Sequence, residues 1–340
     1  MVHMPQHGDV LGFYEQWPTP VVIISDGPYG LGGYTGDPRR TSELAAWYAP
    51  HIAWWARAAT PETTLWFWAT ELSWATVHPV IQQHGWHYAE CSVWDKGKTH
   101  IAGNVNSKTI RGLPVTTEVC CRYTRTSLAV VPNVTDTTGK TLPANAWLRA
   151  EWQRTGLPLR ETNAACGVRD AATRKYFTTE ADLWYPPPEK RMEKLRQYVA
   201  EYGDAAGAPY FSLSVQDTRA VWSRAKWNHQ HGLTNVWSAP PVRGAERIKR
   251  HGKTLHPNQK PLRLMEQLLL LSSDSGDVVW EPFGGLCTAA VAAQRVGREC
   301  YCAEVNQCYW EAAAARLKGD IVPETPKLPK RLGLWGDTRR

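Results

Sequence analysis

A glycine-rich turn between two expected strands is the first feature of the sequence that suggests chemistry. The strand from Val278 leads into the turn Glu281-Pro282-Phe283-Gly284-Gly285, a helix and a second strand follow, and Glu304 ends that second strand. Glycines let a ligand approach the backbone closely, and an acid about twenty residues further on can accept hydrogen bonds from both hydroxyls of a ribose. The pattern predicts a nucleoside-cofactor site, with a helix-capping role for Glu304 as the alternative.

A second candidate site follows the short β-branched strand Val21 to Ile24. The turn Asp26-Gly27-Pro28-Tyr29 brings a carboxylate, main-chain carbonyls and an aromatic ring to the end of that strand. Such strand ends are where α/β sheets bind ligands. The alternative is a tight turn in which Asp26 is a cap and Tyr29 packs in the core.

A third motif, His256-Pro257-Asn258-Gln259-Lys260-Pro261, opens the helix before the glycine-rich strand. Together the three motifs resemble those of amino-directed DNA methyltransferases, which methylate adenine N6 or cytosine N4. Asp-Gly-Pro-Tyr resembles their Asp-Pro-Pro-Tyr, His-Pro-Asn-Gln-Lys-Pro resembles their cofactor-side motif, and Glu-Pro-Phe-Gly-Gly resembles their Asp-Pro-Phe-x-Gly. The order matches the beta group of that family, which runs catalytic motif, target-recognition region, cofactor motifs. The resemblance covers roughly residues 18 to 128 and 235 to 318, and Asn235-Val236-Trp237 also looks like the family's approach to its His-Pro motif.

The resemblance implies methyl transfer from S-adenosylmethionine, leaving S-adenosylhomocysteine, to the exocyclic amine of a flipped base in double-stranded DNA. Asp26 and the Gly27 carbonyl would accept hydrogen bonds from the amine, Pro28 completes the motif, and Tyr29 would stack on the base. Glu304 would hold the cofactor ribose, while Asn258 and Lys260 would border the methionine end. The implied cofactor-binding residues are Asn258, Lys260, Glu281, Phe283, Gly285, Thr288 and Glu304. Aspartate at the first catalytic position favours adenine N6 over cytosine N4.

Three positions depart from the family pattern. Gly27 replaces the first proline of the catalytic motif, Glu281 stands where aspartate is usual, and Leu286-Cys287 replaces the usual Ser-Gly. The glycine keeps the needed carbonyl but makes a softer turn. A non-catalytic DNA-binding relative is therefore an alternative to the enzyme, and methylation of RNA or of a protein amide is a third hypothesis.

The surrounding elements predict the fold that must position these motifs. Strands and amphipathic helices alternate before residue 131 and again after about residue 262, which indicates an α/β sheet with parallel strands. The expected fold is a Rossmann-like methyltransferase domain with an inserted, mostly helical target-recognition domain. Residues 1–131 would form the catalytic half, 132–240 the inserted domain, 241–322 the cofactor-binding half and 323–340 a basic tail.

The inserted region carries a weaker signal. The segments Leu148 to Arg154, Leu159 to Ala165 and Val168 to Phe177, with Gly156 and Gly167 between them, predict a helix-turn-helix-like reader of the major groove. An ordinary helical hairpin is the alternative. Basic residues here and before the His-Pro motif are candidates for contacts with DNA phosphates. These candidates are Arg160, Arg169, Arg174, Lys175, Arg243, Arg247, Lys249 and Arg250.

Composition limits the remaining choices. The 340 residues are 43% hydrophobic and carry a formal net charge of +7, a globular composition that suits a polyanion partner. No apolar run approaches the ~20 residues of a membrane-spanning helix. The eight cysteines lack zinc-like spacing, so no metal site is expected, and they are interpreted as reduced thiols in a cytoplasmic protein. The family resemblance implies a bacterial or phage-encoded protein. By resemblance, the expected protein partners are a cognate restriction endonuclease and a second copy of the chain.

Overall fold

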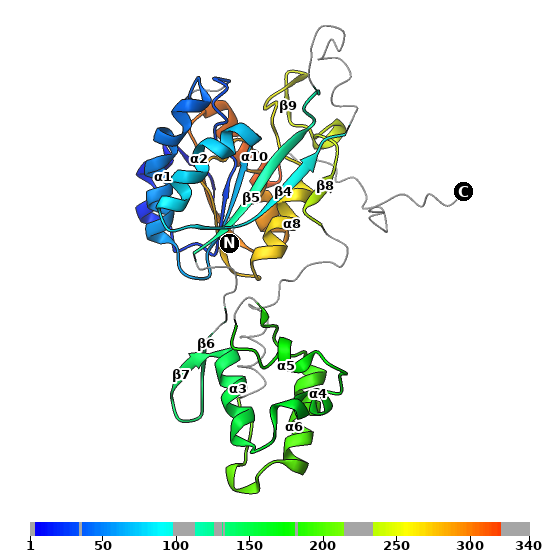
Figure 1. Ribbon diagram of the computed structural model, residues 1–340. Helices are drawn as coiled ribbons and strands as arrows, with labels where there is room; N and C mark the ends of the chain where they lie inside the picture. Colours follow the sequence, from blue (N-terminus) through cyan, green and yellow to red (C-terminus); the bar gives the residue numbers. More distant parts are fainter. Residues whose placement is uncertain are drawn as a thin grey trace, which may run out of the picture. The chain divides into compact units, whose positions relative to one another are not determined.

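The chain folds as two compact units, and the sequence of one is inserted within the sequence of the other. In the computed structural model the described residues are 4–33, 36–97, 113–125, 131, 133–180, 183–213 and 234–320. The larger unit combines residues 1–125 with residues 229–340, and the smaller unit comprises residues 126–228 (Figure 1).

An eight-stranded sheet in the order β1-β12-β11-β2-β3-β5-β4-β8 forms the centre of the larger unit. Neighbouring strands are parallel from β1 to β3, β5 is antiparallel to both of its neighbours, and β4 pairs in parallel with β8. Every residue of β2 and β3 is buried, as expected for strands covered on both faces. The strands are β1 (Gln6–His7), β2 (Val22–Ser25), β3 (Thr64–Ala69), β4 (His87–Asp95), β5 (Thr117–Thr124), β8 (Val236–Ser238), β11 (Val278–Glu281) and β12 (Glu299–Glu304).

Helices cover both faces of this sheet (Figure 1). α1 (Leu44–Ala58) and α2 (Glu71–Gln83) pack with Leu65 and Phe67 of β3 in one buried cluster. Trp66, the residue between them, points to the opposite face, where its indole donates to Ser272 at the end of α8 (Leu262–Ser272). The remaining helices are α9 (Thr288–Arg295) and α10 (Gln307–Lys318). The Rossmann-like α/β fold expected from the sequence is thus confirmed, with the antiparallel β5 as its departure from an all-parallel sheet.

The smaller unit has a core of its own. The short hairpin β6 (Asn133–Thr135) and β7 (Thr141–Pro143) precedes α3 (Ala144–Arg154), α4 (Thr162–Ala165), α5 (Ala172–Lys175) and α6 (Glu189–Tyr202). Its buried cluster includes Trp152, Phe177 and Leu195. All residues of this cluster belong to the smaller unit.

Two expectations about the insert are corrected. Strand β8 pairs with β4 through Val236 and Trp237, so residues 236–238 belong to the main sheet rather than to the insert. The expected helix-turn-helix is also wrong in its second half. The segments on either side of Gly167 (φ 61°) contain only the four-residue helices α4 and α5, too short for a recognition helix. The sequence also predicts a strand at Ser127 to Val131 that pairs with Glu118 to Tyr123, but this segment lies almost wholly outside the described residues. His229 and His231, for which the sequence offers no third metal ligand, lie outside them as well.

No helix among the described residues is long and apolar enough to cross a membrane.

Candidate active site

Side chains from two helices hold the loop at the carboxyl end of β2. Tyr48 of α1 donates a hydrogen bond to the carbonyl of Pro28 (3.2 Å), and Ser73 of α2 donates to the carbonyl of Tyr29 (2.9 Å). The Tyr29 side chain is buried, whereas the Asp26 side chain keeps 21% exposure. The loop therefore presents a partly open carboxylate on a fixed backbone.

Gly27 is packed too tightly for any side chain. A Cβ atom at this position would lie 2.5 Å from the ring of Phe283 and 2.5 Å from the Tyr48 hydroxyl. The place that a proline ring would take is thus filled by an aromatic ring and a hydroxyl. This packing explains the first departure from the family pattern.

Lys260 lies against the catalytic motif. Its ammonium donates to Oδ1 of Asp26 (2.7 Å) and to the Tyr29 hydroxyl (3.0 Å), and it is 3.3 Å from Oε2 of Glu118 on β5. Lys96 forms a second ion pair with Oε1 of Glu118 (2.5 Å). The sequence placed Lys260 at the methionine end of the cofactor, whereas the structure gives its ammonium to Asp26, Tyr29 and Glu118.

The His-Pro motif explains how Lys260 reaches this position. Gln259 donates to the carbonyl of Glu246 (2.8 Å) and accepts from the amide of Ile248 (3.0 Å), which fixes the segment before α8. Glu246 in turn accepts from the amide of Leu262 in the first turn of the helix (2.7 Å). With the backbone on both sides fixed, the Lys260 side chain is only 2% exposed and reaches Asp26.

Burial and charge act against each other in this group. Burial raises the pKa of the Asp26 carboxyl, and the Lys260 ammonium opposes that rise. Burial would also raise the pKa of Glu118, but Lys260 and Lys96 together outweigh it and lower that pKa. Burial alone would lower the pKa of Lys260, yet Asp26 and Glu118 raise it, so the lysine is charged.

The glycine-rich turn lies beside Glu304, as the sequence predicts. Oε2 of Glu304 accepts from the amide of Gly285 (2.7 Å), and Oε1 accepts from the amide of Asn306 (2.7 Å). Gly285 has a left-handed φ of 53°, which favours glycine. Each carboxylate oxygen thus has one backbone donor and further acceptor capacity.

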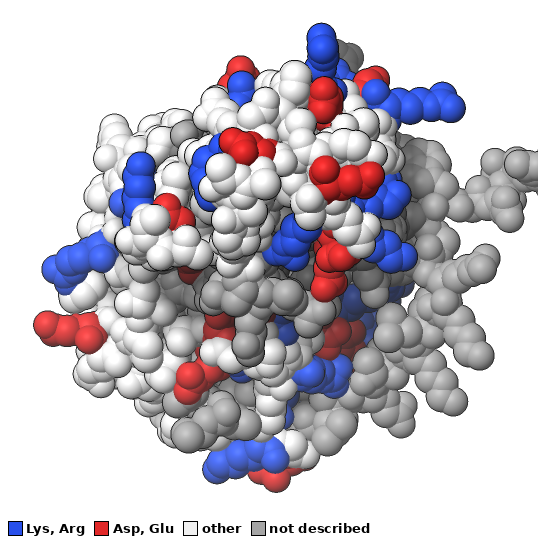
Figure 2. Space-filling view, turned by 90° about the horizontal axis from the view of Figure 1, so that it is seen from below, with Lys and Arg blue, Asp and Glu red and all other residues white. Residues whose placement is uncertain are grey.

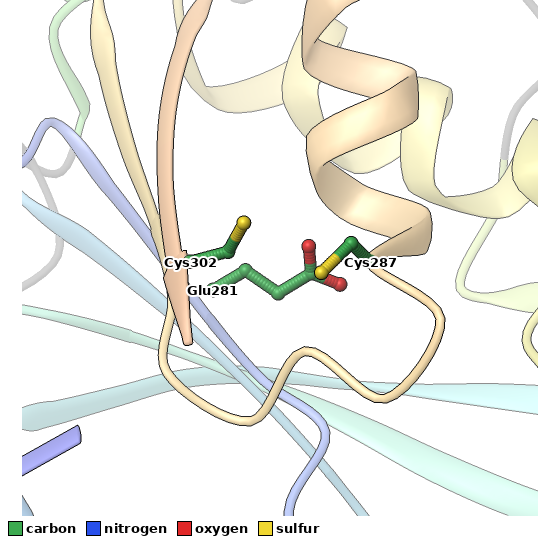
Figure 3. Close-up of side chains that lie close together, drawn as sticks. All are labelled: Glu281, Cys287 and Cys302. Atoms are coloured by element: carbon green, nitrogen blue, oxygen red, sulfur yellow. The ribbon is translucent and has the colours of Figure 1, made fainter. Parts of the chain in front are cut away.

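Glu281 has a different environment. Its two carboxylate oxygens accept from the amides of Ala289 and Ala290, so the side chain caps α9. Figure 3 shows this carboxylate beside the thiol of Cys287, with Cys302 of β12 close by. One ligand atom from each of the three lies within 4.8 Å of the others, and all three residues are buried. Both oxygens are already engaged by α9, which favours a structural role for this cluster.

One cavity of about 670 Å³ joins the two halves of the site. All eleven residues that the sequence assigned to catalysis or cofactor binding line it. Its wall also includes Asp9, Trp47 and His51, which the sequence analysis did not single out. Burial lowers the pKa of His51 to about 4, so this imidazole is neutral at ordinary pH. The strand before Asp9 has only two residues, too few to give a recognisable strand pattern.

The candidate DNA-binding residues fall into two groups. Seven of them are exposed: Arg160, Arg169, Arg174 and Lys175 of the insert, and Arg243, Lys249 and Arg250 of the larger unit. Arg247 instead bonds the carbonyls of Val242, His256 and Pro257, which makes it a brace for the His-Pro segment. On the face in Figure 2, basic and acidic side chains of the described residues are interspersed.

The fold and this cavity define a class of protein. The solved structure of the PvuII DNA methyltransferase, described as cytosine-N4-specific, superposes with a TM-score of 0.51 and 13% identity, covering 91% of this chain and 84% of that one. This likeness shows a methyltransferase fold. The chain also matches the model of the DNA methylase family of N6 and N4 enzymes over residues 21–315. The chain belongs to that DNA methylase family.

Two curated relatives match shorter segments. The type II methyltransferase M.HinfI of Haemophilus influenzae is 38% identical over 97 residues, 28% of this chain and 27% of that protein. The DNA adenine methyltransferase YhdJ of Escherichia coli K12 is 36% identical over 91 residues, 27% of this chain and 30% of that protein. The matches thus span less than a third of each relative.

Proposed function

We propose that this protein is a site-specific DNA methyltransferase that transfers a methyl group from S-adenosylmethionine to an exocyclic amine of double-stranded DNA. The observation that carries the proposal is the single cavity shared by Asp26, at the end of β2, and Glu304, at the end of β12. A carboxylate suited to an amine and a carboxylate suited to a ribose thus face one space.

The cofactor half of the cavity has the chemistry for an adenosine group. Glu304 has acceptor capacity left for the two ribose hydroxyls after its bonds to Gly285 and Asn306. Phe283 packs against Trp47 with ring centroids 5.2 Å apart, which gives the pocket an apolar wall, and Asn258 and Thr288 complete it. When bound, S-adenosylmethionine supplies an electrophilic methyl group on a sulfonium sulfur.

Asp26 prepares the amine. The lone pair of an exocyclic amine is delocalised into the base ring, so the nitrogen is a weak nucleophile. The Asp26 carboxylate and the Gly27 carbonyl accept its two N–H groups and favour a pyramidal nitrogen whose lone pair is free. With S-adenosylmethionine bound, its sulfonium would supply the methyl group to this nitrogen and leave as the thioether of S-adenosylhomocysteine, and Asp26 would take the proton that the nitrogen releases.

Tyr29 receives the base after it leaves the duplex. Its hydroxyl donates either to Asp26 (3.0 Å) or to Glu118 (3.2 Å), which anchors the ring beside the catalytic carboxylate. Stacking on this ring offsets part of the lost base stacking. The role assigned to Tyr29 is therefore positioning of the target base.

Adenine N6 is the proposed target. The first catalytic residue is an aspartate, and YhdJ, which matches over 91 residues, is named as an adenine enzyme. Cytosine N4 is the second candidate, because the fold of the PvuII enzyme, described as cytosine-N4-specific, is similar. A restriction endonuclease partner is proposed from the likeness to the type II enzyme M.HinfI.

The proposed transfer needs no metal ion, because Asp26 and the cofactor together supply every step. Dialysis against EDTA is expected to leave the methylation rate unchanged. Metal analysis of the purified protein gives an independent measurement, since zinc bound at Glu281, Cys287 and Cys302 would contradict the structural role of that cluster.

Expression in a methylation-free bacterial host tests the function. The host DNA is digested to nucleosides, and modified bases are identified by mass spectrometry. N6-methyladenine is expected, while N4-methylcytosine would keep the mechanism and change the base. If neither appears although the protein binds S-adenosylmethionine, RNA or protein becomes the substrate. A protein that binds no cofactor would be a non-catalytic relative.

A further inference from the structure

Four charged side chains from four segments meet beneath the catalytic loop. They are Asp26 after β2, Lys96 after β4, Glu118 on β5 and Lys260 before α8. Lys260 bridges Asp26 (2.7 Å) and Glu118 (3.3 Å), and Lys96 bonds the other oxygen of Glu118 (2.5 Å). The side chains of Lys260, Glu118 and Lys96 are 2%, 9% and 14% exposed, so they are shielded from bulk water.

The group balances its charges. Two carboxylates face two ammonium groups, and the rings of Tyr29 and Trp68 lie 5.2 Å and 5.3 Å from the Lys260 nitrogen. A buried charge without a partner is strongly unfavourable. Each member therefore depends on the others for its charged form.

Lys260 bonds only one oxygen of Asp26. Oδ1 accepts from Lys260, with Tyr29 as a second donor, whereas no hydrogen bond from the described residues reaches Oδ2. The carboxylate is thus held from one side, and its second oxygen is left for the amine of a base. The same ammonium is shared with Glu118, whose other oxygen pairs with Lys96.

Other groups near Asp26 are neutral or more distant. Tyr48 of α1 and Cys120 of β5 both interact electrostatically with Asp26, and burial raises the pKa of each well above its ordinary value. Glu281 of β11 also feels the charge of Asp26, and burial raises its pKa to about 8. Lys260 and Glu118 are therefore the charged groups that act on Asp26 among the described residues, and Lys96 acts through Glu118.

We propose that Glu118 and Lys96 are positioning residues: Glu118 competes with Asp26 for the Lys260 ammonium, Lys96 limits that competition by pairing with Glu118, and this balance sets the lower pH limit of methyl transfer. This inference rests on the proposed function, because only an ionised Asp26 can take up the proton that the amine releases. Neither Glu118 nor Lys96 touches the substrate.

The charges predict opposite effects for different substitutions. Lys260→Met removes the positive partner, so Asp26 is harder to ionise, and the acidic limb of the kcat profile moves up by about 1–3 pH units. Lys96→Met moves the acidic limb up by a smaller amount, because Lys260 still pairs with Asp26. Glu118→Gln removes a negative neighbour and frees Lys260 for Asp26, so the limb moves down.

The experiment measures kcat against pH for wild type and these three variants. Glu90→Gln is the matched control, since Glu90 pairs with Arg122 on the same two strands (3.1 Å) and none of the bonds described at Asp26 involves it. Its profile is expected to match wild type. The pKa of Asp26 is measured independently by carboxyl carbon-13 NMR of the cofactor-free protein, with Asp26→Asn to assign the signal.

Opposite shifts for Lys260→Met and Glu118→Gln, in rate and in NMR titration, would support the proposal. Shifts of the same sign, or unchanged limbs in an active enzyme, would overturn it while leaving the proposed function intact. Should Lys260→Met fail to fold, Lys96→Met and Glu118→Gln still give opposite signs. If wild type methylates no DNA, the proposed function fails, and the NMR titration alone then tests the charge arrangement.

Discussion

At the scale of single residues, the structure explains why Gly27 departs from the family motif. From the sequence, a glycine in place of proline suggested only a softer turn. In the structure it faces Phe283 and Tyr48 at distances that exclude a Cβ atom. The substitution is therefore part of the packing between the catalytic loop and the cofactor loop.

Gly27→Ala is expected to damage the enzyme rather than restore a family-like turn. Overpacking costs about 1–3 kcal/mol of stability. A displacement of about 1 Å in the catalytic loop would lower kcat by roughly 100-fold. Thermal unfolding and a methylation assay on the same preparation check both effects.

Gly12→Ala is the control for that experiment. No atom lies within 4 Å of a Cβ at this position, and its backbone is outside the left-handed region. Its stability is expected to stay within about 0.5 kcal/mol of wild type. A Gly27→Ala enzyme with wild-type stability and rate would show that the loop has room.

The charged residues at the site differ in how well a sequence reveals them. Asp26 and Glu304 follow strands and occur in recognisable motifs. Glu118 is a single acid in the strand Thr117–Thr124, and Lys96 begins a polar loop, so neither has a local pattern. Their role appears only in the folded sheet, where β5 and the segment after β4 bring Glu118 and Lys96 to Lys260 and Asp26.

At the scale of elements, the sequence predicts the main domain well. The expected strand at Val21 to Ile24 is observed as Val22–Ser25, and the helix expected from about residue 262 begins at Leu262. Continuous apolar runs and helical periodicity specify these elements locally. The pairing of β8 with β4, far apart in sequence, has no local signal.

Glu281 shows how one side chain can stabilise an element. It caps the first amides of α9 while buried, and burial raises its pKa to about 8 from an ordinary 4.5. Because the folded pKa exceeds the unfolded one, the folded state binds more protons between these values. Stability from this group therefore falls as pH rises from about 4.5 to about 8.

Glu281→Gln is expected to remove this pH dependence. The amide copies the protonated acid, so the variant should gain stability relative to wild type by on the order of 1 kcal/mol per pH unit across that window. Denaturant unfolding at a series of pH values measures the difference. Glu281→Ala is the comparison, since it leaves two buried amides unpaired and should be less stable at every pH. A constant difference between wild type and Glu281→Gln would contradict the raised pKa.

At the scale of the whole molecule, the order of the three motifs along the chain indicates a family of enzymes, which no single motif does. The two halves of the main domain are separated by the insert, yet β2 and β11 pair directly in the sheet. The helical content of the insert was foreseen, but its layout was not, because Gly167 and short helices give weak periodicity. Family motifs constrain the main domain, whereas the insert has none.

The insert is expected to contribute to DNA affinity through its exposed basic residues. Replacing Arg160, Arg169, Arg174 and Lys175 by alanine should weaken DNA binding and flatten its dependence on salt concentration, since fewer counterions are released. Cofactor affinity should not change. Fluorescence anisotropy at several salt concentrations measures the slope, with Lys140→Ala and Lys190→Ala as exposed controls in the same unit. An unchanged slope would remove these four residues from the DNA interface.

The central claim is that Asp26 activates an amine in a cavity that separately binds the cofactor. The most direct test measures methyl transfer to DNA and S-adenosylmethionine binding by calorimetry for wild type and Asp26→Ala. We predict that the variant loses methyl transfer and keeps nearly the same cofactor affinity, because Glu304 and the glycine-rich turn lie in the other half of the cavity. An Asp26→Ala protein that still methylates DNA would contradict the mechanism.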